Sequence, residues 1–139
     1  MSTAYDVRVP TVRVRDQARP GGEPGEELVL PDLPERVSVR ELIRTRVREE
    51  VARANADRSQ PRRLLVAPLE AEETANGYRL REGRLIDWER QAEVAVEAFE
   101  KQSFFLFVDG KQVGTLDEEV ALGVDSEVRF LRLTPLVGG

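Results

Sequence analysis

Cysteine and histidine are both absent from this chain of 139 residues. Their absence excludes a thiol nucleophile, an imidazole base, disulfide bonds and an ordinary zinc site built on these side chains. Paired carboxylates could still perform acid–base chemistry. However, the acidic residues are scattered among arginines and form no recognisable pair of that kind. We therefore expect a protein that is not an enzyme and that has no metal or cofactor of its own.

Lysine is also scarce, since only Lys101 and Lys111 are lysines among 21 basic residues. If copies of this protein were joined through side chains, these two residues would be the possible acceptors. The net charge of −5 disfavours nucleic acid as the main partner. No apolar run is long enough to span a bilayer, and residues 1–10 lack the pattern of a secretion signal. We therefore expect a cytoplasmic protein with no membrane partner.

The N-terminal part shows the alternation that is typical of a strand hairpin. Valines alternate with charged residues from Val7 to Val14, with an interruption at Pro10. Residues 19–25 are rich in proline and glycine, which favours a loop. Glu27–Leu30 then forms a second short apolar segment. The sequence therefore predicts two strands joined by a long loop.

A helix is predicted directly after this hairpin. Ser38 and Glu41 have the spacing of a capping box, and Val37 and Leu42 have the spacing of a hydrophobic staple. One apolar stripe then recurs at helical spacing, formed by Val39, Leu42, Ile43, Val47 and Val51. Arg40, Arg44 and Arg48 form a basic ridge on another face. This ridge is either a solvated face, partly neutralised by Glu41, Glu49 and Glu50, or a docking surface for a partner.

The middle of the chain gives weaker signals. Leu64–Val66 fits either a short strand or a packed extended segment, and Asn76-Gly77 indicates a turn. A second helix is predicted to begin near Asp87 as its N-cap. Its apolar face would contain Trp88, Ala92, Ala95, Val96 and Phe99. A tryptophan at this spacing is more often part of the core than a platform for a ligand.

The last third of the chain is rich in predicted strands. Phe104–Val108 and Lys111–Val113 flank Asp109-Gly110, which is a strong hairpin-turn signal. Residues 115–118 indicate a turn, and residues 127–133 a final strand. A hairpin, a helix and further strands in this order indicate an α+β fold.

Several strings resemble the ubiquitin-like β-grasp superfamily. Phe107–Val113 (Phe-Val-Asp-Gly-Lys-Gln-Val) resembles the third-strand turn of ubiquitin, and Thr115-Leu116 resembles its Thr-Leu turn. Ser126–Leu131 resembles the start of its last strand. Residues 133–139 (Leu-Thr-Pro-Leu-Val-Gly-Gly) resemble the tail of the bacterial sulfur carriers of thiamin and molybdopterin synthesis.

This resemblance implies a single β-grasp domain over residues 1–139, in which one helix crosses a mixed sheet. It covers about residues 11–52 and 103–139. Residues 56–102 would be an insertion with a helix near residues 87–101. Residues 134–139 would be a flexible tail.

The resemblance also implies a function for the tail. In this family an activating (E1-like) adenylating enzyme uses ATP to activate the C-terminal carboxylate, here that of Gly139. Because glycine lacks Cβ, Gly138 and Gly139 would let the extended tail enter a narrow channel of the enzyme and would leave its carbonyl open to attack. Pro135, Leu136 and Val137 would contact the enzyme. A thiolate of an E2-like conjugating enzyme would accept the acyl group, and a peptidase would reverse the conjugation.

Three functions follow from these observations. The Gly-Lys-Gln turn favours a bacterial ubiquitin-like protein modifier that is joined to its target by an isopeptide bond. The tail with its proline and two glycines favours a sulfur carrier, in which Gly139 becomes a thiocarboxylate. The added length is also compatible with a non-covalent β-grasp interaction or assembly module.

A second candidate site lies on the predicted sheet. If Leu106 and Val108 point into the core, Phe105 and Phe107 point outward and form a partner surface together with Leu131. Alternatively, the inserted helix covers this face. The register of the last strand is open between two alternatives. Either Val128 and Phe130 point inward, or Leu131 and Leu133 do, because a slip of one residue exchanges the two faces; a bulge near Phe130-Leu131 would reconcile them.

Overall fold

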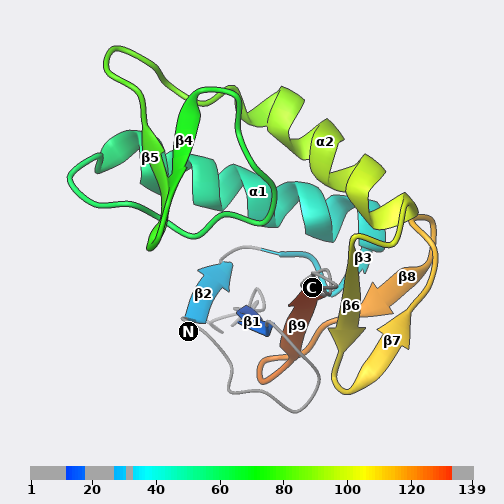
Figure 1. Ribbon diagram of the computed structural model, residues 1–139. Coiled ribbons are helices and arrows are strands. Elements are labelled where there is room, and N and C mark those ends of the chain that lie inside the picture. Colours follow the sequence, from blue (N-terminus) through cyan, green and yellow to red (C-terminus); the bar gives the residue numbers. More distant parts are fainter. Residues whose placement is uncertain (1–11, 18–26, 31–32, 133–139) are drawn as a thin grey trace, which may run out of the picture. The chain divides into compact units, whose positions relative to one another are not determined.

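The computed structural model describes residues 12–17, 27–30 and 33–132 (Figure 1). The predicted strand pattern before Val12, the loop 19–25 and the tail 134–139 lie outside these residues. The described chain forms two compact units. The first unit contains the residues up to Val39 and from Gln102 onward, and the second unit contains Arg40–Lys101.

The first unit contains a mixed sheet of five strands in the order β2-β1-β9-β6-β7. Strand β1 pairs antiparallel with β2 and parallel with β9, and β6 pairs antiparallel with both β9 and β7. The strand bounds are Val12–Gln17 (β1), Glu27–Leu30 (β2), Phe104–Val108 (β6), Lys111–Val113 (β7) and Glu127–Arg132 (β9). The predicted N-terminal hairpin and the α+β class are therefore confirmed.

The register of β9 is regular along its whole length. Val128 pairs with Val14 on one side and with Val108 on the other, and Phe130 pairs with Leu106. These side chains lie on one face of the sheet, where Val128 and Phe130 are fully buried. This pairing matches the alternative in which Val128 and Phe130 point inward. No bulge interrupts the described pairing, and Leu133 lies outside the described residues.

A second, two-stranded sheet joins β3 (Arg36–Ser38) to β8 (Glu119–Ala121). Val37 and Val120 pair at its centre, and both are buried. The sequence did not predict either strand, because a strand of three residues with one buried side chain has no detectable period. Residues 115–118 form the predicted turn, with a hydrogen bond of 3.3 Å from the Glu118 N–H to the Thr115 carbonyl.

Helix α1 (Val39–Ala56) follows β3 directly, as the capping signal at Ser38 predicted. The residues of the predicted apolar stripe are all at most 3% exposed. Within the second unit, the helix also contains a buried ion pair between Arg46 and Glu50. Glu50 accepts a further hydrogen bond of 3.0 Å from the Leu65 N–H, so the segment around Leu65 is fixed to the helix.

The segment after α1 forms a hairpin, which the sequence signalled only by its turn. Strands β4 (Ala71–Thr74) and β5 (Gly77–Leu80) pair antiparallel. Leu64 and Leu65 are buried but lie in no strand, which matches the alternative of a packed segment. Arg62 forms an isolated bridge to Tyr78 and extends the hairpin on its other side.

Helix α2 (Trp88–Glu100) begins at the predicted residue. Asp87 is its N-cap, and the Asp87 side chain accepts hydrogen bonds from the N–H groups of Glu89 and Arg90. Ala92, Ala95, Val96 and Phe99 form the buried face of α2, together with Gln91. The buried Gln91 side-chain amide donates a hydrogen bond of 2.7 Å to the Val66 carbonyl, so this polar group has a partner inside the protein.

Candidate functional site

The predicted reactive end of the chain lies outside the described residues. This applies to Gly138 and Gly139 and to the predicted contact residues Pro135, Leu136 and Val137. What the structure describes is the strand that precedes them. Strand β9 lies between β1 and β6 and ends at Arg132, so the tail follows a central strand of the sheet.

The three residues of the predicted partner surface do come together in the structure. Phe105 pairs with Leu131 across β6 and β9, so their side chains lie on the same face of the sheet. Phe107 lies on this face as well, and it pairs with Arg129 and Gln112. Both phenylalanines are half-buried, whereas Leu131 is 8% exposed. The accessible apolar surface on this face is therefore contributed by the two aromatic rings.

Paired charges lie beside this aromatic face. Arg129 pairs with Arg15 in the neighbouring strand β1. Each arginine has its own carboxylate partner, because Arg129 contacts Glu127 at 2.6 Å and Arg15 contacts Glu27 at 3.0 Å. The like charges are thereby compensated. The result is an aromatic centre with a neutralised polar rim, which is the usual composition of a protein-docking surface.

Two segments that resemble ubiquitin, Phe107–Val113 and Ser126–Leu131, are joined by hydrogen bonds of Asp109. Asp109 and Gly110 have φ values of 48° and 84°, which is the pattern of a type I′ hairpin turn. The Asp109 carboxylate accepts hydrogen bonds of 3.1 Å from the Ser126 hydroxyl and 2.8 Å from the Glu127 N–H. The Asp109 N–H donates to the Glu127 carbonyl at 2.8 Å. The β6–β7 turn is thus fixed to the start of β9.

The two lysines have different surroundings. Lys101 is the C-cap of α2, and its Nζ lies 2.8 Å from a Glu97 carboxylate oxygen. The hydrogen bond and the charge of Glu97 raise the pKa of Lys101, and the same pair lowers the pKa of Glu97. Lys111 is exposed at the start of β7, directly after the Asp109-Gly110 turn.

The basic ridge of α1 is largely solvated, since Arg40 and Arg48 are exposed and Arg44 is half-buried, but it also contacts an aromatic ring. Arg44 and Arg48 each hold their guanidinium carbon 5.5 Å from the centre of the Trp88 ring, which is within the range of a cation–π contact. Of the three predicted acidic neighbours, Glu41 lies 3.7 Å from Arg44 of the ridge. Glu49 contacts Arg53, and Glu50 contacts the buried Arg46.

Trp88 is also not the fully buried core residue that its helical spacing predicted. Its side chain is half-buried, while the other four residues of the predicted face are buried. Sequence periodicity identified the correct face of the helix. It could not show that arginines of α1 cover the ring, because this contact joins residues about 40 positions apart in the chain.

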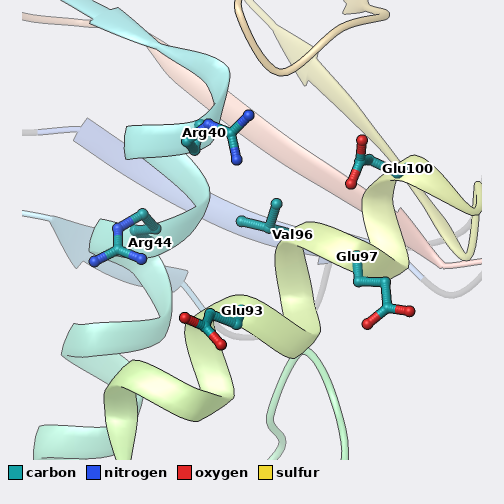
Figure 2. Close-up of a pocket in the computed structure, with 6 residues that line it drawn as sticks. All are labelled: Arg40, Arg44, Glu93, Val96, Glu97 and Glu100. Atoms are coloured by element: carbon teal, nitrogen blue, oxygen red, sulfur yellow. The ribbon is translucent and has the colours of Figure 1, made fainter.

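An open groove of about 420 Å³ lies between α1 and α2 in the second unit (Figure 2). It is lined by Arg40 and Arg44 from α1 and by Glu93, Val96, Glu97 and Glu100 from α2. The Glu97 carboxylate points away from α1 in this view. One wall is therefore basic and the other acidic. The sequence analysis identified the basic ridge of α1 but not the acidic side chains of α2, and the fold shows that the two face the same groove.

Comparisons with known proteins found no matching family model, no matching curated protein and no matching solved structure. Within the described residues, no cluster of three or more acidic side chains is arranged to hold a metal ion. Neither described helix has both the length and the apolar composition that a membrane span requires.

Proposed function

We propose that this protein is a ubiquitin-like modifier or carrier that works through the carboxylate of Gly139. In the proposed reaction, a partner enzyme uses ATP to convert this carboxylate into an acyl-adenylate and releases pyrophosphate. A thiolate of the same or a second partner then displaces AMP. A lysine amine of the target finally displaces the thiol and forms an isopeptide bond.

The observation that carries this proposal is the position of the last strand. The tail of residues 133–139 follows directly on β9, which is bonded on both sides by β1 and β6. A reactive end next to a central strand has a rigid support, because both neighbours hold the strand in register. The mixed sheet and the N-terminal hairpin agree with the fold that the sequence resemblance implies.

The aromatic face supports the same function. A modifier needs a surface that its activating enzyme and its receptors can recognise apart from the tail. Phe105 and Phe107 offer such a surface on the sheet that carries the tail. Aromatic side chains, phenylalanine included, are enriched at the cores of protein interfaces.

Intact mass spectrometry of the protein from its native host tests this proposal. The wild-type chain is compared with a variant that lacks Gly139. The first reading is whether the native chain ends at Gly139. We expect covalent adducts of the wild-type chain with other proteins, and we expect these adducts to be absent from the variant.

The same measurement distinguishes the second candidate function, a sulfur carrier, which the Pro135–Gly139 string favours. A thiocarboxylate replaces one carboxylate oxygen with sulfur, so the free protein would gain about 16 mass units. If both chains have unmodified mass and the variant retains the cellular function, the tail has no chemical role. The chain would then be a non-covalent binding module.

A further inference from the structure

The two helices that line the groove are joined by hydrogen bonds at one end of the pair. There, the Asn55 side chain forms two hydrogen bonds with the backbone of Ile86, at 3.1 Å to its carbonyl and 2.9 Å from its N–H. This contact joins the end of α1 to the start of α2. Near the other end of the pair, Arg40 of α1 lines the same groove as Glu100 of α2. The helices therefore run antiparallel, with oppositely charged walls.

The ion pairs of Arg44 and Glu97 lie within their own helices and do not cross the groove. Arg44 contacts Glu41 on its own helix and the ring of Trp88, and Glu97 contacts Lys101 on its own helix. Across the residues that the structure describes, neither Glu93 nor Glu100 forms a hydrogen bond or an ion pair. The acidic wall therefore presents carboxylates that can accept bonds from a partner.

One residue of the basic wall, Arg44, is held by an aromatic contact before any partner arrives. The guanidinium carbons of Arg44 and of its neighbour Arg48 each lie 5.5 Å from the centre of the Trp88 ring, which limits the freedom of both side chains. Ordering a long arginine side chain costs conformational entropy when an interface forms. A guanidinium that already lies over an aromatic ring has lost part of its conformational freedom, so this cost is smaller. Arginine and tryptophan are also the residue types enriched at the energetic centres of interfaces.

Charge complementarity selects the occupant of the groove. A partner segment with charges of one sign would be attracted by one wall and repelled by the other. A suitable occupant presents both signs at the same separation as the groove itself. The second unit meets this requirement, because a two-fold axis sets the basic wall of one copy against the acidic wall of the other. Residues 40–101 contain 13 basic and 13 acidic residues, so two such units have no net repulsion.

We propose that the α1–α2 groove is a docking surface for a second copy of this chain. In this two-fold interface Arg44 of one copy faces Glu93 of the other, and the reverse contact forms at the same time. The interface uses the second unit only. It is independent of the carboxylate of Gly139, so it goes beyond the proposed function.

Sedimentation velocity of the full chain, over a range of protein concentrations, tests this proposal. We expect a reversible monomer–dimer equilibrium at low ionic strength. Salt should weaken it, because the screening length falls from about 30 Å at about 0.01 M to about 3 Å at about 1 M. Arg44→Glu and Glu93→Arg should each raise the dissociation constant by at least about tenfold, since each places like charges opposite one another.

Recombining the two variants gives the decisive result. An equimolar mixture of Arg44→Glu with Glu93→Arg should form a heterodimer, because opposite charges again face one another in both contacts. The double variant in one chain should dimerise for the same reason. Glu93→Arg leaves Arg44 and Arg48, the cations over the Trp88 ring, unchanged. This variant therefore checks that lost dimerisation does not arise from a lost cation–π contact. A folded wild-type chain that remains monomeric at low salt would overturn the proposal. So would a dimer that neither variant weakens, or a mixture that does not recombine.

Discussion

Asp109 combines two structural roles in one residue. It adopts a φ of 48°, which asparagine, aspartate and glycine tolerate better than other residues. Its carboxylate also accepts hydrogen bonds from Ser126 and from the backbone of Glu127. The same side chain therefore favours the turn conformation and bonds the turn to the strand that leads to the tail.

Replacing Asp109 should lower the stability of the first unit. We expect Asp109→Ala to reduce the free energy of unfolding by about 1–3 kcal/mol, because two hydrogen bonds are lost and alanine is strained at positive φ. Urea unfolding followed by far-ultraviolet circular dichroism, which reports on the strands of the first unit as well, would measure this change. Asp125→Ala is the matched control, since Asp125 is exposed and forms no hydrogen bond or ion pair with any described residue. Equal stability of the two variants would contradict this role of Asp109.

Gln102 is a second residue with a left-handed backbone, and its side chain gives it no evident advantage there. It follows Lys101, the C-cap of α2, with a φ of 61°. Glycine is the residue that most often occupies this position after a helix. We expect Gln102→Gly to raise the free energy of unfolding by about 0.5–1 kcal/mol, because the steric cost of the Cβ exceeds the entropy that glycine adds. Ser103→Gly, where φ is not positive, should show no gain in the same urea titration.

Among the elements, the β4–β5 hairpin depends on the absence of a side chain at Gly77. A Cβ at Gly77 would lie 2.6 Å from the Arg62 carbonyl oxygen, and the φ of Gly77 is +125°. This close approach permits the paired hydrogen bonds between Arg62 and Tyr78, at 2.9 and 2.7 Å. The hairpin is thereby attached to the segment that follows α1.

We expect Gly77→Ala to detach Arg62 from the hairpin. Because alanine adds both a backbone clash and strain, the loss of stability should be larger than about 1–2 kcal/mol. Gly83→Ala is the matched control, since Gly83 also has a positive φ of 73° but no atom within 4 Å of an added Cβ. Amide hydrogen exchange at Tyr78 would measure the effect directly. Similar exchange in both variants would mean that the contact with Arg62 contributes nothing.

The start of α2 is fixed by Glu70, which gives the second unit a dependence on pH. Glu70 accepts two bonds of 2.7 Å from Arg90 and one of 3.2 Å from the Asp87 N–H. Burial alone would raise the pKa of Glu70, but these bonds outweigh it and hold the pKa below its ordinary value of 4.5. The stabilisation is present above this ordinary value, and it is lost as the pH falls through the lower, folded-state pKa.

We therefore expect Glu70→Gln to reduce stability at neutral pH and to flatten the fall in stability below about pH 4.5. Thermal unfolding measured between about pH 3 and about pH 7 would show both effects. Glu72→Gln provides the control, because Glu72 is exposed on the same hairpin. Its profile should follow that of the wild-type chain. A Glu70→Gln profile as steep as the wild-type profile would exclude this carboxylate as the source.

The sequence predicted the elements whose signals are local. Asp87 capped α2 as expected, and Asp109-Gly110 formed the expected turn, because a cap or a tight turn depends on a few adjacent residues. Strands β3 and β8 escaped prediction, since each has three residues and is stabilised by the other. The half-exposed position of Trp88 was also missed, because it depends on arginines of another helix.

At the scale of the whole molecule, the pairing of segments that are distant in the sequence determines which residues share a site. The parallel pairing of β1 with β9 joins residues more than 100 positions apart, and no local pattern contains this information. The composition of the aromatic face was predicted, because alternation along β6 fixes which residues share a face. The groove was not predicted as a site, because its two walls come from different helices and face each other only when α1 and α2 pack together.

The scarcity of lysine limits the sites at which copies of this chain could be conjugated to one another. Attack on a thioester requires an unprotonated amine, and only Lys101 and Lys111 provide side-chain amines. Glu97 holds Lys101 at 2.8 Å and raises its pKa, so this amine is protonated more completely and is occupied by a partner. Lys111 is exposed at the edge strand β7. If copies of this protein are joined to one another, Lys111 is the better acceptor.

We therefore expect Lys111→Arg to remove most self-linked species and Lys101→Arg to remove few, while both variants keep the net charge of the chain. Conjugates with other proteins should persist in the double variant, because its carboxyl end is unchanged. Mass spectrometry of linked peptides from the native host would locate the bond. Self-linked species that survive in the double variant would place the linkage on the N-terminal amine or on a hydroxyl group. Loss of all conjugates in the double variant would instead mean that lysines of this chain take part in an earlier step, such as recognition by the activating enzyme.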